Sequence, residues 1–287
     1  MKHLSNATFA LILPILAACA SMQPGAPAPR HLGWEVPLGT GTATTFAEFD
    51  SQGTPRAIGI AFSKSSLDEL PVEPPYRRCG ERSDGTAPAK CQHTHEFVVP
   101  LPDAAARRRD VPFKWVLLNW QPVGHIPPGI YNVPHFDIHY MMAPIADIFA
   151  IEPGTCGPEF VRCDQFSIGR KPLPVNYMHA DFRDVEGVVP AMGNHLVDLS
   201  GPEFNKQPFT LSWIYGVYDG KVIFYEQMVT RDHLMSKPNA CTPVKSPKAV
   251  AVSGFYPTLS CVHVDPMSGE YRVAMEDFVY RTASAPE

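Results

Sequence analysis

The chain has 287 residues, of which 45% are hydrophobic and 18% charged, and its formal net charge is −5. This length supports a sizeable core, and the composition is that of a globular protein rather than a disordered one. The negative charge and the absence of an extended basic run argue against nucleic acid as a partner. The 31 prolines and 20 glycines disfavour long helices and favour short strands joined by shaped loops.

The N-terminus is typical of a bacterial lipoprotein leader. Residues 9–18 form an apolar run after a short basic start, too short for a membrane span, which needs about 20 apolar residues. The following Leu-Ala-Ala-Cys at 16–19 resembles the lipobox, in which the leader is cut before a cysteine that becomes lipid-modified. We therefore expect a signal peptide over 1–18 and a membrane anchor at Cys19. Ala20 favours the outer membrane, so the prediction is an exported outer-membrane or periplasmic lipoprotein.

The rest of the chain divides simply. Residues 19–38 are predicted to be a lipid-anchored flexible tether, and residues 284–287 a disordered tail. Residues 39–283 contain no internal repeat or linker, so we expect a single mainly β domain. Its predicted architecture is an antiparallel sandwich or barrel with a few short helices and disulfide-closed loops.

Six cysteines remain besides Cys19, and an even number in an exported chain indicates disulfides. They fall into three pairs that are close in sequence and flanked by loop residues. The predicted disulfides are Cys79–Cys91, Cys156–Cys163 and Cys241–Cys261. A cysteine metal site is the competing interpretation, but it needs thiolates, which an oxidising envelope does not preserve.

The first half of the domain begins with a predicted hairpin. Residues 42–49 and 56–62 form its strands, joined by a polar turn that contains Gly53 and Pro55. A serine cap and an acidic first turn predict a short helix over 65–70. The later elements predicted from composition and turn signals are strands at 95–101 and 113–121, a helix at 143–151, an irregular segment at 154–176, a turn into a strand at 188–198, a hairpin of 208–217 and 221–229, a helical turn at 230–235 and a last strand at 271–281.

The most informative stretch is 124–142, GHIPPGIYNVPHFDIHYMM. Its second half reads as a strand in which His135, Asp137 and His139 alternate with apolar residues. Successive side chains on a strand point to opposite faces, so these three residues share one face. A face of His, Asp and His is a candidate metal site.

Several segments together resemble a bacterial family of unknown function, the Thermus-type secreted proteins with an H-F-D-x-H signature. The matching segments are GTGTATTFAEFDSQGTPRAIGIAF, LNWQPVGHIPPGIYNVPHFDIHY, VPAMGNHLVDLSGPEF and PFTLSWIYGVYDGKVIFYEQMVT. The resemblance implies a β-rich extracytoplasmic domain and carries no activity with it. The chain departs from the family pattern at Met141, Leu196 and Gln227, and the cysteine-closed loops are additions.

Strand geometry limits which residues can share an ion. His135 and His139 are roughly 13 Å apart at Cα, whereas residues two apart are separated by about 6.6 Å. The natural pair is therefore Asp137 with either histidine. His135, Asp137 and His195 would resemble the facial triad of two histidines and one carboxylate found in non-haem iron enzymes.

The complete candidate ligand set is His135, Asp137, His139, His195 and Glu226. Glu226 is also the candidate general base, and His125 is a spare ligand. The ion would be Zn, Mn or Fe. Whether the protein is an enzyme stays open at this stage.

Two other interpretations remain open. The His/Asp cluster could be a structural hydrogen-bond network in a non-catalytic lipoprotein that binds a small ligand or a partner, or it could simply face solvent. A structural role as a homo-oligomer, formed through an exposed sheet edge, is a third hypothesis. Glu276 and Asp277 are expected to be an exposed edge feature of the last strand.

Overall fold

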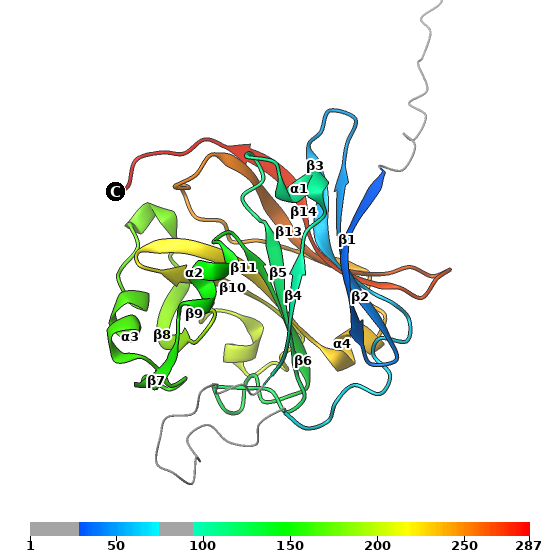
Figure 1. Ribbon diagram of the computed structural model, residues 1–287, viewed down its shortest axis with the longest axis horizontal. Coiled ribbons are helices and arrows are strands. Elements are labelled where there is room, and N and C mark those ends of the chain that lie inside the picture. The colour runs from blue at the N-terminus through cyan, green and yellow to red at the C-terminus, as the bar shows by residue number, and fades with distance from the viewer. Residues whose placement is uncertain (1–28, 75–93) are drawn as a thin grey trace, which may run out of the picture.

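The computed structural model describes residues 29–74 and 94–287. Within them, two antiparallel sheets form the framework of the fold (Figure 1). The six-stranded sheet has the order β1-β2-β3-β14-β13-β12, and the seven-stranded sheet has the order β4-β5-β6-β11-β10-β9-β8. The predicted mainly β, antiparallel fold with a few short helices is confirmed.

The elements of the six-stranded sheet are β1 Arg30–Leu38, β2 Gly41–Phe49, β3 Pro55–Phe62, β12 Ala240–Pro243, β13 Gly254–Val264 and β14 Tyr271–Arg281. Those of the seven-stranded sheet are β4 His95–Pro100, β5 Trp115–Gln121, β6 His135–Met141, β8 Phe182–Val189, β9 Gly193–Asp198, β10 Leu211–Tyr218 and β11 Lys221–Thr230. The short elements outside the sheets are α1 Asp103–Ala106, α2 Ile145–Phe149, β7 Pro153–Cys156, α3 Cys163–Gly169, α4 Arg231–Met235 and two 3₁₀ helices, Val175–Tyr177 and Pro202–Asn205.

The main core lies between the two sheets. Phe62 of β3 packs on Phe136 of β6 with ring centroids 5.0 Å apart. The hydroxyl of Tyr140 on β6 donates to the Val273 carbonyl of β14, in the opposite sheet, at 3.2 Å. Because the even-numbered residues of β6 face this core, the odd-numbered residues His135, Asp137 and His139 lie on the other face of the sheet.

That other face is also covered. Ile148 of α2 packs with Trp115 of β5 and Phe224 of β11 in one hydrophobic cluster. Tyr131, from the loop before β6, packs with Phe209 in a second cluster. The central part of the face between these clusters carries the candidate ligands.

Both predicted hairpins are present, and β14 coincides with the predicted last strand. The helix predicted over 65–70 is wrong: the segment forms successive turns instead. Ser66 N donates to Ser63 O at 2.9 Å, and Asp68 N donates to Ser65 O at 3.1 Å, both with the short spacing of turns. The Asp68 carbonyl accepts from Thr40 N, which ties the segment to the start of β2.

The predicted ends of the domain also need correction. β1 occupies Arg30–Leu38, which was assigned to the tether, and it pairs antiparallel with β2. The tail over 284–287 is not free: Ser284 N donates to Val250 O at 3.2 Å, and Val175 N donates to Glu287 O at 3.1 Å. β13 was missed, and 154–176, expected to be irregular, contains β7 and α3.

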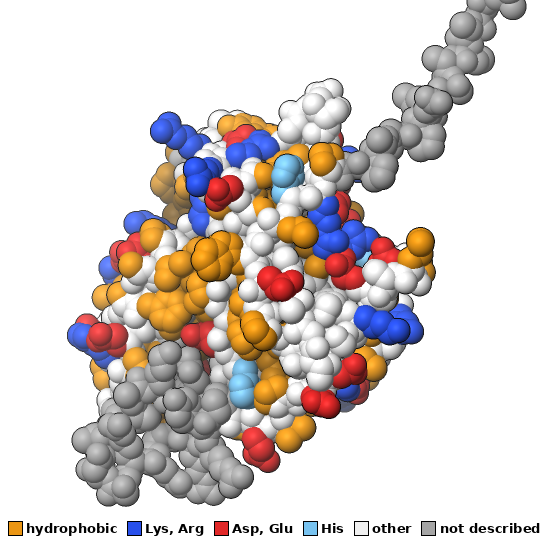
Figure 2. Space-filling view, turned by 45° about the vertical axis from the view of Figure 1, so that its right-hand side comes forward, with side chains coloured by type: hydrophobic (Ala, Val, Ile, Leu, Met, Phe, Trp, Pro, Cys, Tyr) orange, Lys and Arg blue, Asp and Glu red, His pale blue; other side chains and the backbone are white. Residues whose placement is uncertain are grey.

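The disulfides Cys156–Cys163 and Cys241–Cys261 are formed as predicted. The predicted Cys79–Cys91 pair, the signal peptide and Cys19 lie outside the described residues. No helix among the described residues is long and apolar enough to cross a membrane. On the face drawn in Figure 2, basic and acidic side chains lie near one another toward the edges, and hydrophobic side chains gather between them.

Candidate metal centres in one cavity

Three strands of the seven-stranded sheet, β6, β11 and β9, bring His139, Glu226 and His195 together. His139 on β6 and Glu226 on β11 are direct partners in the antiparallel register. His195 lies on β9, beyond β10, and its partner on β10 is Gly216. Gly216 has no side chain, and the ring of Phe224 occupies the space where its Cβ would lie. That ring packs against both histidines, with centroids 4.9 Å from His139 and 5.1 Å from His195.

We call these three residues the Glu226 centre. The Nε2 atoms of His139 and His195 are 3.5 Å apart. His139 Nε2 lies 3.4 Å from Glu226 Oε1, and His195 Nε2 lies 3.7 Å from Glu226 Oε2. Metal–ligand bonds of 2.0–2.2 Å in tetrahedral geometry place ligand atoms about 3.4 Å apart. The donor atoms of the three residues are therefore spaced as ligands of one ion.

A second group, which we call the Asp137 centre, consists of His125, His135 and Asp137. His135 Nε2 lies 3.0 Å from Asp137 Oδ1 and His125 Nε2 lies 3.6 Å from Asp137 Oδ2. His135 and Asp137 come from β6, whereas His125 comes from the loop that precedes it. Gln121 Nε2 on β5 donates to Asp137 Oδ2 at 2.9 Å and fixes the carboxylate.

All four histidines are held in the same way. Each Nδ1 lies against a backbone carbonyl: Ile126 O for His125 at 2.7 Å, Val133 O for His135 at 2.6 Å, Leu117 O for His139 at 3.1 Å and Gly187 O for His195 at 3.0 Å. A carbonyl can only accept, so Nδ1 carries a hydrogen, and Nε2 is the ring nitrogen that faces the centre and could bind a cation when the ring is neutral. Histidines that bind metals are typically oriented by such a second hydrogen bond.

Burial determines the protonation of the Glu226 centre. It lowers the pKa of His139 to about 4, and together with His139 it lowers that of His195 to about 3. Burial, followed by the Asp137 carboxylate, holds the pKa of Glu226 well above its usual range. Without a cation, this centre at neutral pH therefore consists of two neutral histidines and a protonated carboxyl group.

The Asp137 centre has the opposite charge state. Burial acts to raise the pKa of Asp137, but His135 and His125 outweigh it and hold that pKa well below its usual range. Burial also lowers the pKa of His125, and the attraction of the Asp137 carboxylate reverses this and raises it. The Asp137 centre therefore holds an ionised carboxylate.

Both centres open into one cavity of about 350 Å³. Its polar lining includes Asp137, His139, His195 and Glu226, together with His125 from the loop. Most of the remaining lining is apolar, with residues that include Ile126, Ile130, Val189, Met192, Phe204 and Met228. The cavity combines cation ligands with room for a small and largely apolar molecule.

The structure groups the predicted ligands differently from the sequence interpretation. His195 joins His139 and Glu226 rather than His135 and Asp137. His135 and His139 fall into different groups, as strand geometry requires. His125, the spare candidate, belongs to the Asp137 centre. Its only signal in the sequence was its position just before the proline-rich turn.

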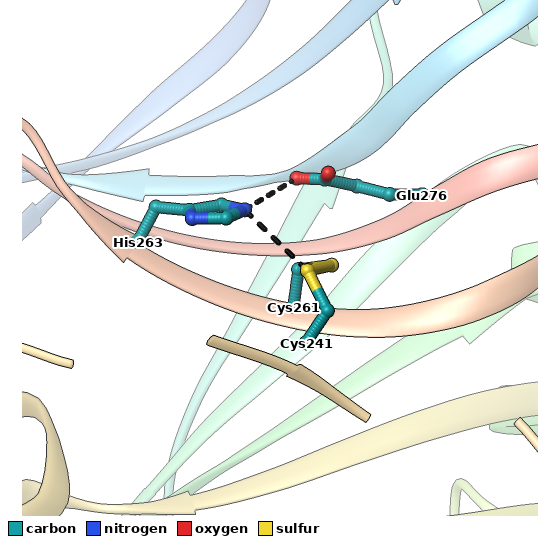
Figure 3. A group of neighbouring side chains, drawn as sticks. All are labelled: Cys241, Cys261, His263 and Glu276. Carbon is teal, nitrogen blue, oxygen red and sulfur yellow. Dashed lines mark hydrogen bonds and ion pairs between the residues drawn. A yellow bond between two sulfur atoms is a disulfide. The ribbon is translucent and has the colours of Figure 1, made fainter. Parts of the chain in front are cut away.

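A third group consists of Cys241, Cys261, His263 and Glu276 (Figure 3). His263 Nε2 lies 3.0 Å from Glu276 Oε1 and 3.8 Å from Cys241 Sγ. The two sulfurs are joined in a disulfide, so they are not thiolate ligands. The edge role predicted for Glu276 is wrong, because at this residue β14 pairs with both β3 and β13.

Searches among protein-family models, curated proteins and solved structures found no match for this chain. The fold and the cavity define a β-sandwich protein with His/Asp/Glu groups that could hold a metal ion.

Proposed function

We propose that the protein is a metal-dependent protein of the bacterial cell envelope that holds a divalent cation at the Glu226 centre. The observation that carries the proposal is the convergence of the His139 and His195 Nε2 lone pairs with a carboxylate that has an unpartnered oxygen. Glu226 Oε2 is buried and has no hydrogen-bond partner. A cation would satisfy all three groups at once. Two histidines and one carboxylate suit Zn, Fe or Mn.

The ion would keep an open coordination position toward the cavity, because the protein supplies three ligands. Such an ion activates a bound water or polarises a carbonyl oxygen of a ligand. His139, His195 and Glu226 hold the ion, and Phe224 excludes water from one side of the two imidazole rings. The apolar lining would hold the ligand body, so the substrate class we favour is a small, mainly apolar molecule with an oxygen donor.

The alternative is a non-catalytic lipoprotein whose His/Asp cluster is a structural hydrogen-bond network. This is less favoured at the Glu226 centre, because two Nε2 atoms without hydrogens cannot bond to each other, and the single hydrogen of the protonated Glu226 carboxyl group can serve only one of them. The Glu226 oxygens also lie 3.4 and 3.7 Å from these nitrogens, longer than a usual hydrogen bond, and an unpaired buried oxygen costs about 1–3 kcal/mol. The cation removes both costs.

Metal analysis of the full chain, exported so that its disulfides form, tests the proposal. We expect metal bound at the Glu226 centre to disappear in His139→Ala and in His195→Ala. His179→Ala is the matched control, because this half-buried histidine lies outside both centres. Folding is checked by circular dichroism. Wild-type protein that contains no metal and takes up none on dialysis against Zn²⁺, Mn²⁺ or Fe²⁺ would contradict the proposal.

Envelope anchoring is a separate part of the proposal, supported by the lipobox-like sequence before Cys19 and by the two disulfides, which suit an oxidising compartment. The resemblance to the Thermus-type secreted family agrees with it. We propose no nucleic-acid partner, because the chain is acidic. Cys19→Ser is expected to release the protein from the membrane fraction and to abolish fatty-acid labelling. Membrane association that survives the change would contradict the lipid anchor.

A further inference from the structure

We infer that the Asp137 centre binds a second divalent transition-metal cation, so that His125, His135 and Asp137 place one ion and the Glu226 centre another in the same cavity. The ion at the Glu226 centre is the one proposed in the previous subsection. The Asp137 centre is an independent site, and its occupation does not require an ion at the Glu226 centre.

The spacing of the donor atoms is the first support. The distances of 3.0 Å from His135 Nε2 to Asp137 Oδ1 and 3.6 Å from His125 Nε2 to Asp137 Oδ2 bracket the separation of about 3.4 Å between ligands of one tetrahedral ion. The two histidines approach different oxygens of the same carboxylate. A cation between them would have two imidazole nitrogens and a carboxylate as ligands.

The orientation of His135 is the second support. Its Nε2 and Asp137 Oδ1 are close, yet neither atom has a hydrogen-bond partner, although both are buried. The His135 side chain is fully buried and its Nδ1 hydrogen is already used by Val133 O. With Nδ1 used in this way, Nε2 is the ring atom left to meet the carboxylate. A divalent cation that takes the place of a proton between Nε2 and Oδ1 would give both buried atoms a partner.

The surroundings of Asp137 are the third support. Gln121 donates one hydrogen bond to Asp137 Oδ2 and leaves its own Oε1 buried without a partner. A carboxylate oriented by a neighbouring amide is the arrangement that metal ligands usually have. This amide lies on β5, and β5 and β6 are paired directly at Gln121 and His135. The ligand geometry is therefore fixed by the sheet, except at His125.

The two centres share no ligand. Asp137 contacts His125 and His135, whereas Glu226 contacts His139 and His195. The arrangement is two separate ions that face one cavity, and not a pair bridged by a common carboxylate. Two divalent ions carry four positive charges against the two carboxylates, so occupation of both sites makes the polar part of the cavity cationic.

Zinc stoichiometry tests the inference directly. The full chain with its disulfides is stripped of metal and dialysed against buffered Zn²⁺, and bound zinc is measured by elemental analysis. We expect two ions per chain in the wild type, one in His125→Ala, one in His195→Ala and none in the double variant. Asp137→Asn, which keeps the side-chain volume, is a second probe of the Asp137 centre. His179→Ala should retain two.

The outcomes separate the two proposals. One ion in the wild type, lost in His195→Ala and retained in His125→Ala, would overturn the second site and leave the proposed function standing. Two ions that both persist in His125→Ala and Asp137→Asn would also overturn it, because the second ion would then lie elsewhere. One ion lost only in His125→Ala would support the Asp137 centre and refute the Glu226 centre.

Discussion

His139 and His195 face each other through Nε2 atoms 3.5 Å apart, although each ring gives its Nδ1 hydrogen to a backbone carbonyl. Burial keeps both rings neutral, so neither Nε2 has a proton to share. Glu226 lies against both of them. A metal ion is the ligand that this group of donors accommodates best. Several measurable consequences follow from the protonation states of His139, His195 and Glu226.

Metal binding at the Glu226 centre should release about one proton at pH 7. Burial and Asp137 keep the pKa of Glu226 well above its usual range, so its carboxyl group is protonated until a cation displaces the proton. Isothermal titration calorimetry with Zn²⁺, in two buffers of different ionisation enthalpy, measures the release. His125→Ala is used as the background so that only the Glu226 centre is titrated.

In the His125→Ala background, Glu226→Gln should bind zinc more weakly than the native Glu226 centre and release almost no proton. Proton release that is unchanged in Glu226→Gln would show that another group supplies the proton. An affinity that does not increase with pH would contradict the protonated state of Glu226.

The metal-free protein should lose stability in acid because of the two histidines. The pKa of His195 is lowered to about 3 in the folded state and is about 6.5 when unfolded. As the pH falls below 6.5, the His195 ring is therefore protonated in the unfolded chain but not in the folded protein, which lowers the free energy of unfolding. At pH 5.5 this costs about 1.4 kcal/mol for one such histidine.

Urea unfolding at pH 7.5 and 5.5 measures this loss. Glu226→Gln is the reference, because the raised pKa of Glu226 contributes pH dependence of the opposite sign. The Glu226→Gln/His195→Gln double variant should lose about 1.4 kcal/mol less unfolding free energy between pH 7.5 and 5.5 than Glu226→Gln does. Equal losses in the two variants would mean that the His195 ring is protonated in the folded protein.

Gln121 should affect the metal affinity of the Asp137 centre alone. Its amide donates to Asp137 Oδ2 at 2.9 Å, and loss of such an orienting bond typically lowers metal affinity by about 10–100-fold. We expect Gln121→Ala, measured by zinc titration in the His195→Ala background, to show a decrease of this size. Gln207→Ala, at an exposed position, should have no effect. An unchanged affinity in Gln121→Ala would remove Gln121 from the site.

Part of this arrangement could be predicted from the sequence. The alternation of β6 places His135, Asp137 and His139 on one face because strand side chains alternate whatever the rest of the fold is. The β10–β11 hairpin was evident from the Asp219-Gly220 turn, at which both residues adopt positive φ. Two disulfide pairs followed from their closeness in sequence.

The grouping into two centres could not be predicted. It depends on which strands become neighbours, and β6 pairs with β11 about ninety residues later in the chain. The reach of His195 toward His139 depends on Gly216 of the intervening β10, which has no sequence motif of its own. β1 was missed for a related reason: Trp34 is largely exposed, so the strand is held mainly by its backbone pairing with β2 and lacks a clear alternating pattern.

Loss of the two described disulfides should have different consequences for stability and for the cavity. Cys156 and Cys163 are seven residues apart, whereas Cys241 and Cys261 are twenty apart. The chain-entropy model gives about 2.5 kcal/mol for the shorter loop and about 3.3 kcal/mol for the longer one. Paired Cys→Ser variants, each unfolded in urea at pH 7.5, test this order.

The shorter loop has a second role, because it carries Glu159, which lines the cavity. Opening the Cys156–Cys163 disulfide should therefore disturb the cavity wall and leave both metal centres intact, since β6, β9 and β11 supply every ligand except His125. Zinc stoichiometry should remain at the wild-type value in both double-serine variants. Loss of zinc in the Cys156→Ser/Cys163→Ser variant while the sheet stays folded would mean that the loop, and not the strands, fixes the ligand geometry.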